Sequence, residues 1–483
     1  MNETFARFRS VAAAAAAVAL ASCATVDREA APQTEVPIAS LGGTATAVEW
    51  PRDDWWRRYN DPQLDALIAD GLAGSPTLAA ARARIARANA AAGVARAALL
   101  PEVAGNGTAT YQRYSENYIF PPPIGGSWQT DARLALDASW EIDFWDKNGA
   151  ALRAALSQAQ AASAEEQAAR LTLTTTIARA YFDLQRLFAQ REVSRAAITQ
   201  REDIVRITNE RFAAGLDTKV EVRQAEAALG TVRTQLAQYD DAIGVARNRL
   251  AALVGAGPAR GESIVAAAPS APAAQLPAAI PLDLLGRRPE IAASRWRVDA
   301  SREDIKVARA QFYPNVNVVA FAGLSSLGLS NLLLGASSIF GVGPAIHLPI
   351  FEGGRLNANL QGREADADLA VSTYNQTVVE AVQDLADAVT SIRGLARTSE
   401  EQAKARTATD EAYNLAVIRY RAGLGNYLTV LTAQTQELEQ DRLNVDLTAR
   451  AFELDVNLAR ALGGGYADPA YPKLAATRQE QAQ

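Results

Sequence analysis

A long structural plan occurs twice in this chain, and the duplication restricts the fold more than any other feature of the sequence. Pro76 and Pro289 open two segments of similar composition, and each segment closes on the tetrapeptide Val-Ala-Arg-Ala, at 94–97 and at 307–310. Both matches have the same offset, since 289 − 76 and 307 − 94 equal 213. A period of more than two hundred residues is too long for a solenoid, so the sequence predicts a duplicated domain.

Each copy predicts the same order of elements: a helix, two strands, a long helix, a tight turn and a final helix. In the first copy we expect the opening helix over about Asp61–Leu100. Pro101 ends it, because the residue before a proline is disfavoured in the helical conformation. The stretch Lys147–Ala213 contains no proline and corresponds to roughly 100 Å of helix at 1.5 Å per residue. Such a length without internal caps is typical of a coiled coil.

Heptad repeats in the helix after each turn support the coiled coil. In the first copy both seam positions are occupied over five heptads, by Val222, Leu229, Leu236, Ile243 and Leu250 and by Ala225, Val232, Tyr239, Ala246 and Leu253. The second copy repeats the pattern through Leu431, Leu438, Val445, Phe452 and Ala459. The turns also match, because Arg-Phe-Ala-Ala-Gly-Leu at 211–216 returns as Arg-Tyr-Arg-Ala-Gly-Leu at 419–424.

The predicted strands include one with strict alternation. In Trp128–Phe144 every even position is apolar or small except Thr130, whereas all the charges fall on odd positions. Its partner is expected at Val103–Tyr114, and the second copy predicts a pair at Val316–Leu324 and Ile339–Ile350. The pattern fits a tilted membrane strand with an aromatic residue near each end. A half-buried strand of a soluble sheet would alternate in the same way.

The N-terminus predicts export and a lipid anchor. Arg7 and Arg9 precede the apolar run Val11–Ala21, which is too short to span a bilayer and has the layout of a secretory signal. Leu20-Ala21-Ser22-Cys23 follows and resembles a bacterial lipobox. Cys23 is the only cysteine, so it has no disulfide partner. We expect diacylglycerol and palmitate on Cys23, although an ordinary signal peptide with an incidental cysteine is the alternative.

The remaining composition limits partners and oligomeric state. Net charge is −6, from 48 basic and 54 acidic residues, and no basic stripe predicts a nucleic-acid site. No stretch is long enough for a transmembrane helix, so a membrane-crossing form would have to be a barrel. Four strands cannot close one, since the smallest barrels have about 8. Two chains would give a filled eight-stranded barrel and three a twelve-stranded pore, which favours a trimer.

Several motifs carry a family resemblance. Trp55-Trp56-Arg57-Arg58-Tyr59 with the following Asn-Asp-Pro, the segment 284–291 (Leu-Leu-Gly-Arg-Arg-Pro-Glu-Ile), and Phe351-Glu352-Gly353-Gly354-Arg355 resemble hallmarks of outer-membrane efflux channel lipoproteins of the TolC and OprM type, in their NodT branch. The similarity covers essentially the whole mature chain. The resemblance implies a mainly α-helical fold with a transmembrane β part. As a trimer it would form a twelve-stranded β-barrel, continued by a long periplasmic α-helical barrel.

The predicted organisation follows from the motifs and the repeat. It comprises a signal peptide (1–22), a lipid-anchored extension (23–60), a first channel repeat (61–255, strands about 102–144), a linker or equatorial segment (256–288), a second repeat (289–464, strands about 315–350) and a C-terminal tail (465–483). The implied partners are two further copies, a periplasmic adaptor and outer-membrane lipid. An inner-membrane transporter, of the resistance-nodulation-division type, completes the implied set.

The two helix–helix turns are candidate docking tips for the adaptor. They contain Arg211, Gly215 and Leu216 in the first copy and Arg419, Gly423 and Leu424 in the second. Each glycine is also expected on structural grounds alone, because it supplies the left-handed residue that ends a helix.

The stretch after the second tip resembles the periplasmic gate of drug-exporting relatives. Leu428 matches a leucine of that gate, whereas Thr432 and Thr435 stand where the resemblance would place a latching aspartate and arginine. The gate is then expected to depend on Leu428, Tyr427 or the first-copy charges Asp217, Lys219, Glu221 and Arg223. We expect the resting channel to close less firmly than channels that have the latch.

No residue pattern predicts catalysis or a cofactor. The only histidine, His347, has no neighbouring cluster of metal ligands in the sequence, and no nucleophile has a candidate base. The predicted function is therefore a passive outer-membrane duct of a tripartite efflux system for small molecules. Alternatives are a lipid-anchored periplasmic coiled-coil scaffold without a pore, an envelope hydrolase, or a channel for metal ions, signal molecules or secreted protein.

Overall fold

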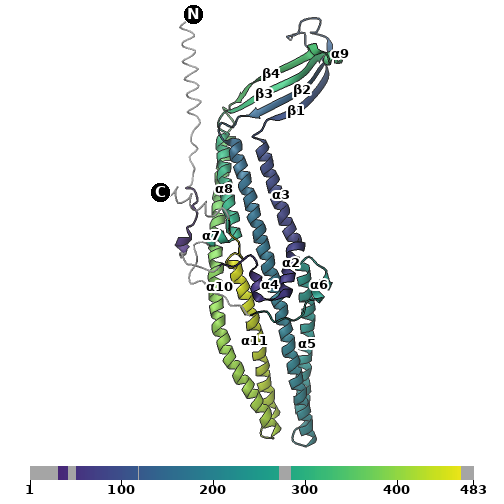
Figure 1. Cartoon of the computed structure of the whole chain (residues 1–483), viewed down its shortest axis with the longest axis vertical. Coiled ribbons are helices and arrows are strands. Elements are labelled where there is room, and N and C mark those ends of the chain that lie inside the picture. The colour runs from purple at the N-terminus through teal and green to yellow at the C-terminus, as the bar shows by residue number, and fades with distance from the viewer. Residues whose placement is uncertain (1–30, 42–49, 118, 271–283, 469–483) are drawn as a thin grey trace. The chain divides into compact units, whose positions relative to one another are not determined.

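The computed structural model describes residues 31–41, 50–117, 119–270 and 284–468 (Figure 1). They form two compact units, each built from both copies of the repeat. The first contains Arg84–Ala162 and Ser294–Tyr374, and the second contains Ser163–Ala293 and the described residues from Asn375 onward. The boundaries between the two units fall inside several helices.

The two copies have the same elements in the same order. The first copy consists of α2 (Pro62–Gly74), α3 (Pro76–Ala97), β1 (Glu102–Arg113), β2 (Trp128–Glu141), α4 (Lys147–Ala213) and α5 (Lys219–Leu253). The second consists of α7 (Leu284–Arg287), α8 (Pro289–Ala310), β3 (Asn315–Leu327), β4 (Ser338–His347), α10 (Arg355–Arg421) and α11 (Tyr427–Ala461). Both long helices have 67 residues and both final helices have 35, which confirms the duplication.

Short helices connect these elements. They are η1 (Ile38–Leu41), η2 (Trp55–Tyr59), α6 (Pro258–Glu262), α9 (Leu329–Leu332) and η3 (Gly335–Ser337). Among the described residues, no helix combines the length and the apolarity that crossing a membrane requires.

The expected single helix over Asp61–Leu100 is wrong in one respect, because it is two helices. Ser75 has extended backbone angles, φ −69° and ψ 122°, between α2 and α3. Pro76 causes the break, since a proline disfavours the helical conformation in the residue before it. The carboxylate of Asp61 caps α2 by accepting hydrogen bonds from the backbone N–H groups of Gln63 and Leu64.

The first unit contains one antiparallel sheet in the order β1-β2-β3-β4. Glu102 pairs with Ser139, Leu136 with Ala322, and Ala322 with Phe340. β2 ends at Glu141, three residues before the predicted end. There the Asp143 carboxylate accepts hydrogen bonds from the backbone N–H groups of Asn148 and Gly149 and so begins α4. β4 likewise ends at His347 instead of Ile350.

The core of the second unit lies between the helices and the segment before α2. Tyr59, Phe182 and Phe452 pack ring against ring, with centroids 4.5 to 5.8 Å apart. The predicted seam of α5 is largely confirmed, because Val222, Leu229, Val232, Ile243 and Leu250 are buried. Burial of such a seam, at about 25 cal/mol per Å² of apolar surface, supplies most of the stability of helices this long.

Candidate functional site

The two faces of the sheet differ in chemistry. Strand register places apolar and small side chains on one face, and the larger ones are exposed. They include Val103, Tyr111, Trp128, Leu134, Leu136, Trp140, Phe340, Val342 and Ile346. Phe340 is the most exposed of them, at 84%. Monomeric soluble proteins rarely expose an apolar surface of this size, so this face is built to contact an apolar medium or a partner.

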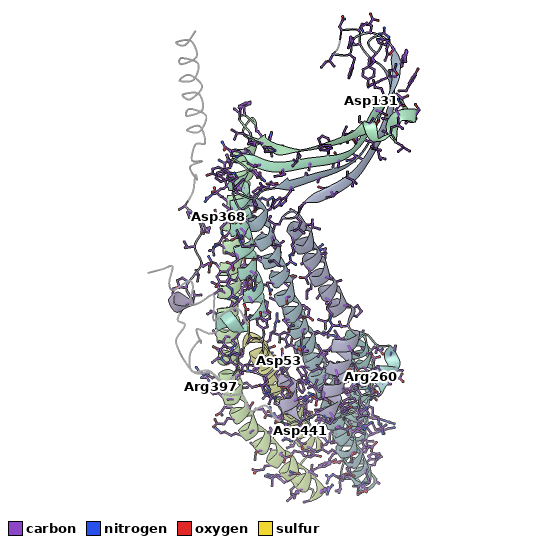
Figure 2. All side chains as sticks on the ribbon, turned by 45° about the horizontal axis from the view of Figure 1, so that its top comes forward. Asp53, Asp131, Arg260, Asp368, Arg397 and Asp441 are labelled. Carbon is purple, nitrogen blue, oxygen red and sulfur yellow. The ribbon has the colours of Figure 1, made fainter. Side chains whose placement is uncertain are left out.

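The opposite face of the sheet is polar in its first two strands. Asp131, which Figure 2 labels on the sheet, accepts a hydrogen bond from the hydroxyl of Tyr114 at 2.9 Å. The Arg133 guanidinium donates to both carboxylate oxygens of Asp137, and the Asn106 amide donates to one of them at 2.8 Å. These partners satisfy the charges without burial, which suits a surface in contact with water.

Aromatic pairs stand near both ends of the sheet. Tyr111 stacks on Trp128 at 5.2 Å between centroids, and Trp145 stacks on Tyr313 at 4.5 Å. The indole N–H of Trp145 donates to the carbonyl of Pro314 at 2.9 Å. Trp and Tyr at two levels are typical of the interfaces between a membrane and water.

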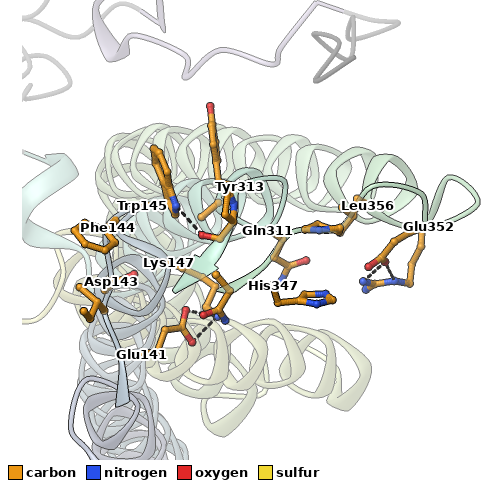
Figure 3. A pocket seen from close by; sticks show the side chains of 16 residues that line it. Glu141, Asp143, Phe144, Trp145, Lys147, Gln311, Tyr313, His347, Glu352 and Leu356 are labelled. Atoms are coloured by element: carbon orange, nitrogen blue, oxygen red, sulfur yellow. Dashed lines mark hydrogen bonds and ion pairs between the residues drawn. The ribbon is translucent and has the colours of Figure 1, made fainter. Parts of the chain in front are cut away.

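A cavity of about 220 Å³ lies where the strands join the long helices of the first unit (Figure 3). Glu141 and Lys147 form an ion pair at 2.6 Å on one side, and Glu352 pairs with Arg355 on the other. His347 lines the same cavity. Asp143 also lines the cavity, so its three carboxylates outnumber Lys147 and Arg355 by one.

The predicted tips have matching backbones. Gly215 has φ +74° and Gly423 has φ +75°, the left-handed conformation that ends α4 and α10. Leu216 and Leu424 are both exposed, as a docking residue would be. The adaptor-docking role of these residues stays a prediction.

The first tip contains a network that the sequence did not reveal. The Arg211 guanidinium donates to the Asp217 carboxylate at 2.9 Å and to the Tyr420 carbonyl at 2.9 Å, and it lies 4.6 Å from the centre of the Tyr420 ring. The Tyr420 hydroxyl donates to the same carboxylate. Although burial opposes it, hydrogen bonds from Arg211 and Tyr420 lower the pKa of Asp217. One partly buried network therefore joins a turn of the first copy to the end of α10.

The predicted gate residues divide into two groups. Leu428 is 63% exposed, and Thr432 and Thr435 are exposed with their hydroxyls bonded to the carbonyls of Leu428 and Leu431. Tyr427, in contrast, is only 2% exposed and belongs to the core cluster that contains Tyr420. Leu428, Thr432 and Thr435 can thus line a pore, while Tyr427 supports the helices behind them.

The first-copy charges named as gate candidates have local roles. Glu221 accepts from the backbone N–H of Thr218 at 2.8 Å in a capping box that begins α5. Arg223 pairs with Glu226 on the same helix. Lys219 is exposed at the start of α5.

A buried carboxyl on α11 escaped the sequence analysis. Glu437 is 7% exposed and accepts a hydrogen bond from the Gln200 amide at 3.4 Å, and its Oε2 has no partner among the described residues. Burial, with Asp410 and Asp441 nearby, raises the pKa of Glu437 to about 7. Gln434, one turn earlier, is also buried, so the buried face of α11 is partly polar, which the apolar seam of Leu431 and Leu438 did not indicate.

Two further predictions concern chemistry rather than packing. Cys23, the predicted lipidation site, lies outside the described residues. Within the described part of the chain, no group of three or more His, Cys, Asp and Glu side chains is placed to hold a metal ion.

Comparison with known proteins identifies the family. The model of the outer membrane efflux protein family matches residues 67–256 and 280–464. The multidrug resistance outer membrane protein MdtP of Shigella flexneri is 33% identical over 466 residues, 92% of this chain and 94% of that protein. The fusaric acid resistance protein FusA of Burkholderia cepacia is 37% identical over 368 residues, 74% of this chain and 69% of FusA.

A solved structure agrees with the fold. The outer membrane protein VceC of Vibrio cholerae has a TM-score of 0.82 and 39% identity, covering 86% of this chain and all of VceC. The resemblance and the fold class stated from the sequence are therefore confirmed. Because the family model spans both copies of the repeat and the relatives match nearly the whole chain, this protein belongs to the outer membrane efflux protein family and is an outer-membrane efflux channel.

Proposed function

We propose that three copies of this chain form a passive duct for small molecules, drugs or other toxic compounds, from a periplasm-spanning pump to the cell exterior. The observation that carries the proposal is the sheet with one apolar exposed face, an opposite face that is polar in β1 and β2, and two edge strands. Among the described strands, β1 and β4 each pair with one neighbour only. Open edges are not tolerated in lipid, and joining three such sheets edge to edge gives a closed twelve-stranded barrel.

The dimensions of the sheet support its placement in a membrane. Trp128 and Trp140 are 12 residues apart (140 − 128) on the apolar face of β2. At about 3.4 Å per residue this is roughly 40 Å along the strand. A tilt of about 45° reduces the height to about 29 Å, close to the hydrocarbon thickness of about 30 Å.

The proposed partners are an adaptor and an inner-membrane transporter of the resistance-nodulation-division type. Two solvent-exposed leucines at matching turns, Leu216 and Leu424, support docking of an adaptor at the tips. The relatives described as multidrug and fusaric acid resistance proteins support a small-molecule cargo. No catalytic step is proposed for this chain, since the transporter would supply the energy.

Cys23 is proposed to carry the diacylglycerol and palmitate that anchor the chain to the outer membrane. Mass spectrometry of the purified N-terminal peptide should show both lipids on Cys23. Cys23→Ser should remove them, and a peptide that begins upstream of residue 23 in the mature protein would contradict the proposal.

Planar-bilayer conductance, with the oligomeric mass measured on the same sample, tests the duct. We expect a trimer with small, discrete openings. Leu136→Lys places a charge on the apolar face and should reduce assembly by about 2–4 kcal/mol, whereas Thr108→Lys on the polar face should be tolerated. A monomer without conductance, or equal effects of the two lysines, would exclude the proposed barrel.

The gate is proposed to rest on Leu428 without an ionic latch. Introducing the latch through Thr432→Asp with Thr435→Arg should lower the resting conductance several-fold. Thr448→Asp, farther along α11, is the matched control, because its hydroxyl also bonds to the preceding turn. Unchanged conductance in the double variant would mean that the resting channel is already closed by other contacts.

A further inference from the structure

A groove of about 590 Å³ crosses three helices of the second unit. Four arginines line it together with three acidic side chains, a threonine and an apolar patch of Ala180, Phe182 and Ala449. The arginines are Arg179 and Arg186 of α4, Arg249 of α5 and Arg450 of α11, and the acids are Asp183, Asp446 and Glu453. Guanidinium groups beside apolar surface are the combination that an amphiphilic anion would contact.

Only two of the four arginines are neutralised. Arg186 bonds to the carboxylates of Asp183 and Asp446, and Arg450 pairs with Glu453 at 2.6 Å. Within the described part of the chain, Arg179 and Arg249 make no ion pair. The groove therefore holds two positive charges without a carboxylate partner.

Arg179 is the more buried of these two arginines. It is partly buried, its Nη2 donates to the Asn457 side chain, and its Nε has no partner among the described residues. Burial and repulsion from Arg460 lower the pKa of Arg179, although attraction by Glu453 partly opposes them. An arginine nonetheless stays charged in proteins, so an anion placed in the groove would stabilise it.

The groove lies on one particular face of α4. Arg179, Asp183 and Arg186 are spaced by four and three residues and so share a face. Tyr181 and Gln185 lie on the opposite side. There Tyr181 donates to the Asp61 carboxylate, and Gln185 accepts from the backbone N–H of Ala267 at 2.8 Å.

The side chains of α11 also separate into a groove side and a covered side. Asp446, Arg450 and Glu453 line the groove, whereas Asp455 on the opposite side accepts from the Tyr59 hydroxyl at 2.5 Å. The segments that contain Tyr59, Asp61 and Ala267 thus cover one side of these helices and leave the groove side open. In a tube built from such helices the covering segments must lie outside, because inside they would obstruct the bore.

We infer that this groove faces the duct and recognises organic anions with an apolar body and a carboxylate or sulfonate group. The inference rests on the proposed trimeric duct, in which three grooves would form a ring. Rings of arginine favour anions in pores, and the planar guanidinium matches a carboxylate in a bidentate manner. The duct would then contribute a preference of its own for anionic cargo.

Block of the full-length channel by 1-naphthoate in planar bilayers tests the inference, measured at low ionic strength so that the charges are not screened. The cation 1-naphthylmethylammonium, of similar size, is the comparison. We expect naphthoate to block the wild type more strongly. Arg179→Gln and Arg249→Gln should each raise the half-blocking concentration about five- to tenfold, as loss of one ordinary hydrogen bond does.

Two control variants separate the groove from general charge effects. Arg195→Gln removes one positive charge from an exposed part of α4 outside the groove and should leave the block unchanged. Arg179→Lys keeps the charge and should retain most of the block. If Arg179→Gln disturbs assembly, the exposed Arg249 still reports on the groove.

Each outcome separates the two proposals. A wild type that does not conduct contradicts the duct itself. A conducting wild type that naphthoate does not block, or an effect of Arg195→Gln equal to that of Arg179→Gln, overturns the anion groove alone.

Discussion

The two tips of the duplicated repeat have the same backbone and different interiors. α5 and α11 begin 208 residues apart (427 − 219), so Arg211 corresponds to Arg419, Phe212 to Tyr420 and Asp217 to Gly425. In the first tip Arg211 is partly buried and bonded to Asp217. In the second, Arg419 is exposed and makes no ion pair within the described part of the chain.

The aromatic residue shows the opposite asymmetry. Phe212 is 45% exposed, whereas Tyr420 is fully buried against the network of the first tip. The glycines that form the turn are therefore the same in both copies. The side chains around them differ, and Arg211 and Asp217 of the first copy bind Tyr420 of the second. The consequence is an intrachain connection from one helical pair to the other, close to the proposed gate.

The largest expected effect comes from breaking this connection. Arg211→Ala leaves the Asp217 carboxylate partly buried without its cation and should destabilise the tip by about 2–3 kcal/mol, since removal of one partner from a buried pair strands the other charge. Arg419→Ala, the matched control, should change stability by less than about 0.5 kcal/mol. Hydrogen exchange of the tip amides measures both, and equal protection in the two variants would mean that the connection is not stabilising.

Glu437 offers a second contrast between the copies, because its counterpart at the same offset is Leu229 (437 − 208). Both side chains are buried. The pKa of Glu437 is about 7 in the folded chain, above its usual 4.5, so the folded chain binds more protons between these values. Glu437 therefore contributes most to stability below pH 4.5, and this contribution is lost as the pH rises through 7.

Glu437→Leu, which restores the residue of the first copy, should raise stability at pH 8 by about 1–2 kcal/mol and remove most of this pH dependence. Thermal unfolding of the purified protein at several pH values measures the effect. Glu439→Leu, an exposed neighbour on the same helix, is the control. If Glu437→Leu keeps the wild-type pH dependence, another group is responsible for it.

Sequence patterns were sufficient for the elements but insufficient for the contacts between copies. The absence of proline predicted a long helix over about Lys147–Ala213, where α4 lies, and alternation predicted the apolar face of β2. The tip network could not be predicted, because Arg211 and Tyr420 are 209 residues apart (420 − 211) and meet only through tertiary packing. The break at Ser75 follows from Pro76 for the same reason that the helix ends before Pro101, since a proline disfavours the helical conformation in the residue before it.

Substitution of either turn glycine by alanine should reduce stability by the same amount, whereas substitution of the two arginines should not. No atom lies within 4 Å of a Cβ added at Gly215, and the only one near Gly423 is the Arg211 Nη1 at 3.9 Å. Strain at positive φ is then the main cost, so Gly215→Ala and Gly423→Ala should each destabilise by about 1 kcal/mol. Thermal unfolding of both variants checks this, and a difference of more than about 1 kcal/mol would show that the two turns are not equivalent.

The smallest expected effect concerns the caps of the helices that follow the turns. Thr218 caps α5 through its hydroxyl, with Glu221 returning a hydrogen bond, whereas Asn426 caps α11 by accepting from the backbone N–H of Thr429 at 3.0 Å. Thr218→Ala removes the hydroxyl of the capping box, and Asn426→Ala removes the two hydrogen bonds that its amide oxygen accepts from the backbone N–H and the hydroxyl of Thr429. Each substitution should cost about 0.5–1 kcal/mol. Exchange of the first-turn amides of α5 and α11 measures each cap locally. A clearly larger loss in α11 would mean that the Asn426 cap contributes more than the capping box, and that the second tip, which has no ion pair among its described residues, depends on its cap for order.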